Sequence, residues 1–238
     1  MQTPIPGADT PVRNIVLVHG AWMNASCWQG VHGLLVEQGH TVSAVALPET
    51  SLADDVAAVR RVLDRQDGGA VLVGHSYGGA VITEAGRHPK AAALVYLAAF
   101  APDAGETVMS LLPGSGEALP VEMTPDGFAF LTRAAVLAGF AADFSPETAS
   151  FLADAQTPIS IPEAGRAPIG APAWRSKPSW YLVSARDRII SPDTERMMAR
   201  RMGAVTAEID GGHLAFVSQP DVAARLIRSA AEAVARAR

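Results

Sequence analysis

The sequence predicts an α/β protein with a mainly parallel sheet of about six strands flanked by helices. Short apolar runs, many of them β-branched, alternate along the 238 residues with longer segments of helical period, as in strand–helix–strand units. These runs are almost continuously apolar, which is typical of parallel strands covered by helices on both faces. The expected strands are residues 14–18, 41–45, 70–74, 93–99, 180–185 and 206–210.

The sequence predicts a helix directly after the second strand. Residues 52–63 place apolar side chains at helical spacing behind Ser51, which we expect to cap the helix. Asp54 lies three residues after Ser51, in the capping-box position. A further helix, residues 77–87, is expected directly after the third strand.

Two more helices are expected near the end of the chain. One begins with Ser191 and Pro192 and ends where Gly203 can cap it. Asp193 and Glu195 fall in its first turn, where negative charge is favourable. Residues 220–236 are rich in Ala and Arg and form the expected closing helix.

One region interrupts the alternation. From about residue 102 to residue 178 the chain is rich in Pro, Gly and Ala and shows apolar clusters but no clear strand. An insertion of this length in a compact fold is more often functional than not. We therefore expect one domain, with a core of residues 1–101 and 179–238 and a short, partly helical cap at 102–178 over the carboxyl edge of the sheet.

Composition excludes several functional classes. A formal net charge of −5 gives no broad basic field for nucleic acid. The longest uninterrupted apolar run, residues 91–101, is shorter than the ~17 to 25 residues that a membrane helix needs. Residues 1–14 lack the segments of a secretory signal, so we expect a mobile, proline-containing tail and a cytoplasmic protein.

Cysteine usage argues against a disulfide or a thiolate metal site. Cys27 is the single cysteine, and no Cys/His cluster accompanies it. Such a cysteine is more often a small buried hydrophobic residue than a nucleophile. The sequence also lacks the glycine patterns of nucleotide-binding loops. We expect no metal and no organic cofactor.

The stretch GHSYG, residues 74–78, has the form G-x-S-x-G between an expected strand and an expected helix. On so tight a turn the positions two before and two after the central residue must lack a Cβ, and here they are Gly74 and Gly78. The context predicts that Ser76 projects above the sheet edge as a nucleophile. A glycine-rich turn that binds phosphate through its N–H groups is the alternative.

A serine hydroxyl needs a base to accept its proton, and six histidines are present. His213 is the best candidate, because it follows the last expected strand in a loop with two glycines. His75 is expected to point away from the Ser76 hydroxyl, and His19 lies in the turn after the first strand. The remaining histidines fall on expected helix surfaces or turns: His32, His40 and His88.

The base in turn needs a carboxylate, which we expect after an earlier strand in the chain order Ser, Asp, His. Asp187 directly follows the strand at 180–185 and is the best candidate. A surface ion pair with a neighbouring arginine is its alternative role. Three other carboxylates fit less well: Asp193, Asp210 and Asp154.

Acyl transfer also needs N–H donors for the developing oxyanion. On a turn of this type they come from the residue after the nucleophile, Tyr77, and from the loop after the first strand, HGAW at 19–22. Gly20 permits a sharp turn there. We therefore expect Ala21 to supply the second donor and Trp22 to form a pocket wall.

Over nearly its full length, through LVHGAW, GHSYGGA, SARDRIISP and GGH, the chain resembles the α/β-hydrolase superfamily. Within it, residues 17–48 look like the branch of plant methylesterases, hydroxynitrile lyases and their bacterial relatives. The resemblance implies the α/β-hydrolase fold, a Ser76, Asp187 and His213 triad, and oxyanion donors at Ala21 and Tyr77.

Two departures narrow the reaction. The lyases of this branch have a threonine and a lysine where this chain has Gly20 and Leu214, so cyanohydrin cleavage is disfavoured. Haloalkane dehalogenases resemble the same fold but carry an aspartate at the position of Ser76.

We therefore expect a serine carboxylic-ester hydrolase that acts on small to medium apolar esters through an acyl-enzyme on Ser76. Hydrolysis of a lactone, an amide or a C–C bond by the same triad is the alternative, as is a weakly catalytic small-ligand receptor. The expected partner is a small-molecule ester, and a homodimer stays open. Pocket residues, each of which could instead be ordinary core, are expected to be Trp22, Met109, Leu112, Phe128 and Leu214.

Overall fold

The computed structural model describes residues 12–112 and 120–236 and contains a six-stranded parallel sheet in the order β2-β1-β3-β4-β8-β9. The sequence predicted all six strands, and the structure shifts their ends by no more than two residues. Their bounds are β1 Asn14–Val18, β2 Thr41–Val45, β3 Ala70–Ser76, β4 Ala91–Ala99, β8 Ser179–Ser184 and β9 Val205–Ile209. The expected N-terminal tail falls largely on residues 1–11, outside the described residues.

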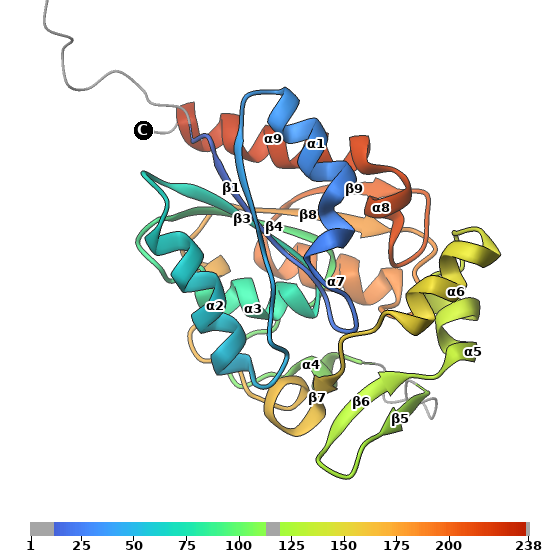
Figure 1. The fold of residues 1–238 in the computed structure, drawn as a ribbon. Coiled ribbons are helices and arrows are strands. Elements are labelled where there is room, and N and C mark those ends of the chain that lie inside the picture. The colour runs from blue at the N-terminus through green and yellow to red at the C-terminus, as the bar shows by residue number, and fades with distance from the viewer. Residues whose placement is uncertain (1–11, 113–119, 237–238) are drawn as a thin grey trace, which may run out of the picture.

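Helices cover both faces of this sheet (Figure 1). One face carries α1 Gln29–Glu37, α8 Ala215–Ser218 and α9 Pro220–Arg236. The other carries α2 Leu52–Asp64, α3 Tyr77–Ala85 and α7 Pro192–Met202. Within the described residues, none of these helices combines the length and apolar character needed to cross a bilayer.

The expected helix ends are confirmed with one change. The Ser51 Oγ accepts the Asp54 N–H at 3.0 Å, as an N-cap should. The Asp54 carboxylate, however, accepts the hydroxyl protons of Thr50 and Ser51 instead of the Ser51 N–H, so the capping box is half formed. At the far end of α7, Gly203 takes the left-handed conformation with φ 63°.

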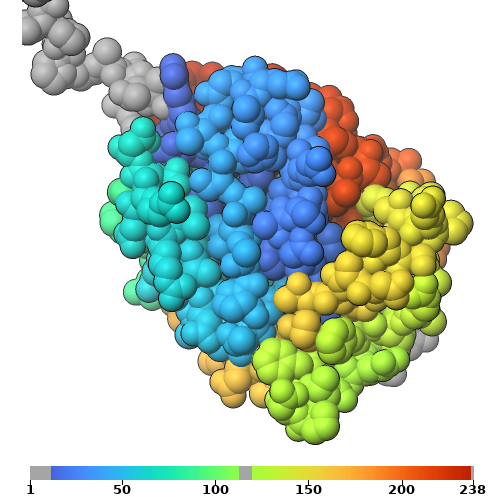
Figure 2. All heavy atoms as spheres, in the orientation of Figure 1, coloured from blue at the N-terminus to red at the C-terminus, as the bar shows by residue number. Residues whose placement is uncertain are grey.

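The segment between β4 and β8 corrects one expectation. It is partly helical, as expected, but it also holds a three-stranded antiparallel sheet that the sequence did not reveal. These strands are two to four residues long, too short for a visible alternation: β5 Val121–Met123, β6 Phe128–Leu131 and β7 Ile159–Ser160. The described α-helices of the segment are α4 Val108–Leu111, α5 Arg133–Ala135 and α6 Pro146–Asp154. Two π-helical turns, Val136–Phe140 and Ile161–Gly165, and a 3₁₀ turn, Ala173–Arg175, accompany them. Figure 2 shows part of it lying against the N-terminal part of the chain.

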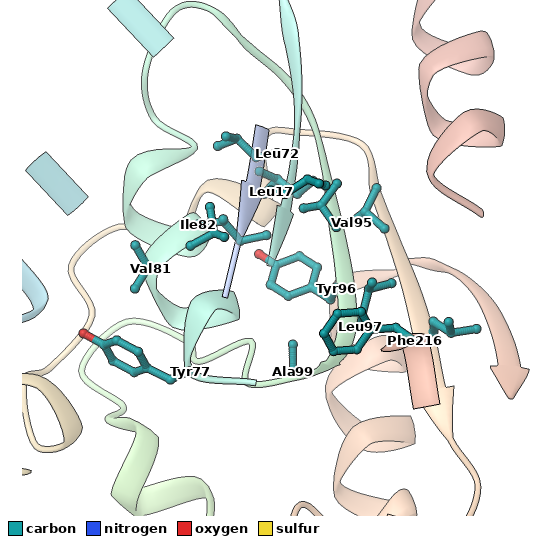
Figure 3. Packing of buried hydrophobic residues seen from close by; sticks show 14 of the residues in the cluster. Leu17, Leu72, Tyr77, Val81, Ile82, Val95, Tyr96, Leu97, Ala99 and Phe216 are labelled. Atoms are coloured by element: carbon teal, nitrogen blue, oxygen red, sulfur yellow. The ribbon is translucent and has the colours of Figure 1, made fainter. Parts of the chain in front are cut away.

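The core lies between the parallel sheet and its helices. Leu17, Leu72 and Ile82 are completely buried there (Figure 3), and each contributes about 1.5–3 kcal/mol by leaving water. The buried Tyr96 hydroxyl meets the Thr83 hydroxyl at 3.0 Å, and the Tyr181 hydroxyl donates to the Ala99 carbonyl. This dense packing holds the carboxyl ends of the central strands rigidly, and the candidate site lies at those ends.

Candidate active site

Ser76 ends β3 on a strained turn. Its φ of 51° and ψ of −123° are a combination that costs a non-glycine residue on the order of 1–3 kcal/mol. A Cβ on Gly74 would lie 2.6 Å from the Gly78 carbonyl oxygen, and one on Gly78 would lie 2.5 Å from the His19 carbonyl oxygen. The two glycines therefore allow the backbone segments to approach closely, as the sequence predicted.

Three side chains meet at this turn. The His213 Nε2 lies 2.9 Å from the Ser76 Oγ, and the His213 Nδ1 lies 2.6 Å from the Asp187 Oδ2. The Asp187 Oδ1 accepts the N–H groups of Ile189 and Ile190 at 2.6 and 3.0 Å. Because the carboxylate accepts from Nδ1–H, the Nε2 lone pair faces the serine hydroxyl. This arrangement can remove the proton from Ser76.

The fold explains how residues distant in sequence converge. Ser76 ends β3, Asp187 follows β8 and His213 follows β9, so all three come from the carboxyl edge of one parallel sheet. The loop before His213 is held by Asp143, whose carboxylate accepts the Gly212 N–H.

The other carboxylates considered from the sequence form ion pairs with arginines: Asp154 with Arg133, Asp193 with Arg196, and Asp210 with Arg186. The surface role considered for Asp187 is not observed, since its side chain is completely buried. The geometry therefore favours Asp187 as the partner of His213.

His75 contacts both the backbone and the ring of His213, which the sequence did not indicate. The His75 Nε2–H donates to the His213 carbonyl oxygen at 3.0 Å, and the two rings lie 4.7 Å apart. Burial holds the pKa of His75 well below its ordinary value, so the ring is neutral. Phe140 packs on the His213 ring from another side, with centroids 5.5 Å apart.

Glu195 corrects a second expectation. The sequence placed it in the first turn of α7 as a negative charge, but its side chain is completely buried. Its Oε2 accepts the Ser184 N–H at 3.1 Å. Burial, and then the charge of Asp187, raises the pKa of Glu195 well above its ordinary value. These shifts favour the neutral form of the Glu195 carboxyl group.

An apolar cavity of about 300 Å³ opens onto Ser76. Arg166 is the one charged residue among the described residues that line it. The other lining residues are Ala21, Trp22, Tyr77, Phe100, Val108, Met109, Leu112, Val121, Met123, Ile159, Ile161, Gly165 and Ile189. Such a cavity suits an apolar ligand with one reactive polar group at the serine.

Three of the five expected pocket residues lie on the cavity wall: Trp22, Met109 and Leu112. Phe128 and Leu214 do not, which corrects the expectation. Phe128 opens β6 and pairs with β7, a sheet that the sequence did not reveal. Leu214 follows His213 directly, but its side chain is buried in the hydrophobic core.

The expected oxyanion donors lie beside the nucleophile, since Ala21 and Tyr77 both line the cavity next to Ser76. A Cβ on Gly20 would come within 2.7 Å of the Ser76 Cβ, so the loop and the turn are in close contact. The Trp22 N–H is already engaged, because it donates to the Glu49 Oε2 at 3.3 Å.

Neither a metal site nor a reactive thiol accompanies this geometry in residues 12–112 and 120–236. No group of three His, Cys, Asp or Glu side chains is placed there to hold an ion. Cys27 is half-buried, and burial raises the pKa of its thiol, which disfavours the thiolate.

Comparison with known proteins agrees with this architecture. The family model described as "Alpha/beta hydrolase family" matches residues 15–226. A carbendazim hydrolyzing esterase from Nocardioides sp. (strain SG-4G) is 35% identical over 127 residues, which are 48% of this chain and 51% of that protein. A pyrethroid hydrolase from Sphingobium wenxiniae is 27% identical over 261 residues, covering 95% of this chain and 90% of that protein.

A solved structure shares the fold. The crystal structure of a pyrethroid hydrolase from Sphingobium faniae JZ-2 superposes with a TM-score of 0.79 at 23% identity, covering 93% of this chain and 98% of that one. At this identity the likeness concerns the fold alone.

Proposed function

The chain belongs to the alpha/beta hydrolase family, and from this premise we propose that it is a serine carboxylic-ester hydrolase that works through an acyl-enzyme on Ser76. One observation carries the proposal: the hydrogen-bonded series from Asp187 through His213 to Ser76 ends at the floor of an apolar cavity. The esterase and hydrolase named among its relatives support the choice of an ester.

Acylation begins when the Ser76 Oγ attacks the ester carbonyl carbon and the His213 Nε2 takes its proton. The resulting imidazolium is stabilised by the Asp187 carboxylate, which keeps its negative charge. Backbone N–H groups of Ala21 and Tyr77 hold the oxyanion. The intermediate collapses, the C–O bond to the alcohol breaks, and His213 returns the proton to the departing oxygen.

Deacylation repeats these steps with water. His213 accepts a proton from a water molecule that attacks the acyl carbon, and the second intermediate releases the carboxylic acid. The proton returns to the Ser76 Oγ, which restores the starting state. Every proton is handled by His213, so the scheme requires no metal and no organic cofactor.

Substrate choice is assigned to the cavity beneath the cap at 102–178. Its mainly apolar lining and volume of about 300 Å³ suit small to medium apolar esters. We also propose that the protein acts in the cytoplasm and that its partner is a small-molecule ester. A homodimer is not needed for the mechanism, because the three catalytic side chains come from one chain.

The test is hydrolysis of p-nitrophenyl esters of increasing acyl length by the wild type and by Ser76→Ala. Ser229→Ala on α9 is the control, because it removes another part-buried serine hydroxyl remote from the site. We expect activity in the wild type and the control and a loss of at least ~1,000-fold in Ser76→Ala. Equal activity in Ser76→Ala would refute the mechanism. Activity confined to lactones, amides or a C–C bond would redirect the substrate class and keep the triad.

A further inference from the structure

Strained backbone is concentrated around the candidate oxyanion site. Among the described residues only four other than glycine have positive φ, and three of them lie here: Trp22 at 63°, Glu49 at 56° and Ser76 at 51°. Such conformations persist where the surroundings over-determine them, and they cluster at functional sites. Glu49 is completely buried, yet the mechanism above gives it no task.

Hydrogen bonds through two buried acids connect these residues. The Trp22 N–H donates to the Glu49 Oε2 at 3.3 Å, and the Glu49 N–H donates to the Asp55 Oδ1 at 2.8 Å. The Asp55 Oδ2 accepts the Tyr77 hydroxyl proton at 2.6 Å. In Figure 3 the Tyr77 side chain accordingly points away from Tyr96 and Leu97. The loop that holds Ala21 is thus joined to the turn that holds Tyr77.

Glu49 and Trp22 also form hydrogen bonds to the inserted segment between β4 and β8. The Glu49 carbonyl oxygen accepts the Ser160 N–H from β7 at 2.9 Å. The Trp22 Nε1–H donates to the Ala129 carbonyl oxygen in β6 at 2.9 Å. Glu49 therefore touches the oxyanion loop with its side chain and the cavity roof with its backbone.

Among residues 12–112 and 120–236, no Lys or Arg forms an ion pair with either acid. His19 is nearest, with its Nδ1 3.5 Å from the Glu49 Oε1. Its Nδ1–H donates to the Gly20 carbonyl oxygen and its Nε2 accepts the Leu47 N–H, which is the pattern of a neutral ring. Burial lowers the pKa of His19 to about 4, so it stays neutral at pH 7.

The two acids therefore share a single negative charge at neutral pH. Burial, with the Asp55 charge adding to it, raises the pKa of Glu49 to about 9. Burial also raises the pKa of Asp55 to about 6, although the Tyr77 hydroxyl opposes the shift. The pKa of Tyr77 is held well above its ordinary value by burial and by Asp55, so it remains a donor. At pH 7 Asp55 is ionised and Glu49 is a neutral carboxylic acid.

We propose that Glu49 and Asp55 form an acid brace that positions the backbone N–H groups of Ala21 and Tyr77 on the substrate oxyanion. Both are positioning residues, because neither lines the cavity. The catalytic part of this inference rests on the proposed function. Its structural part, that the brace fixes the loop at 19–22, does not.

Comparing Glu49→Ala with Glu49→Gln shows whether Glu49 acts through its hydrogen bond to Trp22 or only by filling space. Alanine removes the acceptor for the Trp22 N–H, whereas glutamine keeps a neutral acceptor of the same length. The readouts are the reaction rate of Ser76 with a fluorophosphonate, kcat and KM for p-nitrophenyl butyrate, and hydrogen exchange of the peptide spanning 19–24. Leu63→Ala is the control, because it truncates a fully buried side chain on α2 two turns from Asp55.

We expect Glu49→Ala to lower kcat and the fluorophosphonate rate by about 10- to 100-fold, part of the loss caused by removing one oxyanion donor, with KM changed little. Exchange in the 19–24 peptide should accelerate. Glu49→Gln should stay within about threefold of the wild type, because its amide oxygen still accepts the Trp22 N–H. The Leu63→Ala control should lose stability but keep its kcat.

A pH profile tests the charge state of the brace. In the wild type, kcat should fall as the pH rises through about 9, because ionised Glu49 repels Asp55. Glu49→Gln cannot ionise, so its kcat should stay level there.

The outcomes distinguish the two claims. If the wild type neither hydrolyses esters nor reacts with the fluorophosphonate, the proposed function fails, and the exchange data alone judge whether the brace holds the loop. If Glu49→Ala leaves both the loop exchange and the Ser76 reactivity unchanged, the brace is overturned. Equal losses in Glu49→Ala and Leu63→Ala would also overturn it, since they would indicate general destabilisation.

Discussion

The floor and the roof of the candidate site are built by different physical means. The floor, at the carboxyl ends of β3, β8 and β9, is held by short hydrogen bonds, a strained Ser76 and glycines that no other residue can replace without collision. The roof, from α4 to β7, contributes mainly aliphatic side chains with many acceptable substitutes. We therefore expect substitutions in the floor to abolish the reaction and substitutions in the roof to change the substrate preference.

The largest loss of activity should follow substitution of Asp187, the carboxylate that holds His213. In Asp187→Asn the amide can turn its NH2 group toward the His213 Nδ1, which favours the tautomer with its proton facing Ser76. We expect kcat to fall by about 10⁴-fold, as in other serine triads, with little change in folding. Steady-state kinetics with a p-nitrophenyl ester and a thermal melt check this. A loss below tenfold would mean that Asp187 does not orient the base.

The next effect concerns the close approach at the turn. Gly78→Ala places a Cβ 2.5 Å from the His19 carbonyl oxygen and 2.6 Å from that of Val18, both backbone atoms. We expect a loss of roughly 3 kcal/mol or more in the free energy of unfolding, at the upper end of overpacking costs. Gly33→Ala on α1 is the matched control, since nothing lies within 4 Å of its added Cβ. The control should gain about 0.5–1 kcal/mol from helix propensity, and equal denaturation midpoints for the two variants would contradict the account.

Glu195→Gln tests whether the buried Glu195 carboxyl group makes the stability of the protein depend on pH. Because the pKa of Glu195 is raised in the folded state, folding takes up a proton above the ordinary carboxyl range, and wild-type stability falls as the pH rises. Glutamine removes this dependence, so its stability relative to the wild type should increase from pH 5 to pH 8, by at most about 1.4 kcal/mol per pH unit. Urea melts at several pH values measure it. A difference that does not vary with pH would show that Glu195 is ionised.

A substitution in the roof should change selectivity without changing chemistry. Val121→Phe adds volume to the cavity wall, so kcat/KM for long acyl chains should fall roughly tenfold, while acetate esters change little. The matched control is Val205→Phe, the same substitution at an exposed position in β9. Equal losses for all chain lengths would mean that the cavity does not hold the acyl chain.

The smallest effect is expected at the surface of the inserted segment. Arg133 and Asp154 pair at 2.6 Å, but both side chains are exposed. Arg133→Ala should therefore cost no more than about 1 kcal/mol in chemical denaturation and leave activity unchanged. A larger loss would show that this pair fixes the roof.

The floor was predictable from sequence because its signals are local. Parallel strands read as continuous apolar runs, and GHSYG predicts its own turn. The roof was not, because β5, β6 and β7 are too short to show an alternation, and β6 pairs with β7 from a distant part of the chain. Phe128 was misplaced because of this sheet, whereas Leu214 was misplaced because its side chain packs into the core.

The buried acids were missed on other grounds. Glu49 follows a strand and Glu195 opens a helix, positions where a charged residue is ordinary. Only the tertiary structure reveals their burial and their hydrogen bonds with Trp22 and Ser184. In sequence, a buried neutral acid looks the same as a solvated one.

The most direct test of the central claim is to trap the acyl-enzyme. The wild type would be mixed with a p-nitrophenyl ester, quenched in acid within milliseconds, digested and examined by mass spectrometry. We expect the mass of the acyl group on the peptide containing Ser76, and no adduct in Ser76→Ala. Turnover of the ester with that peptide unmodified at every quench time would contradict the account.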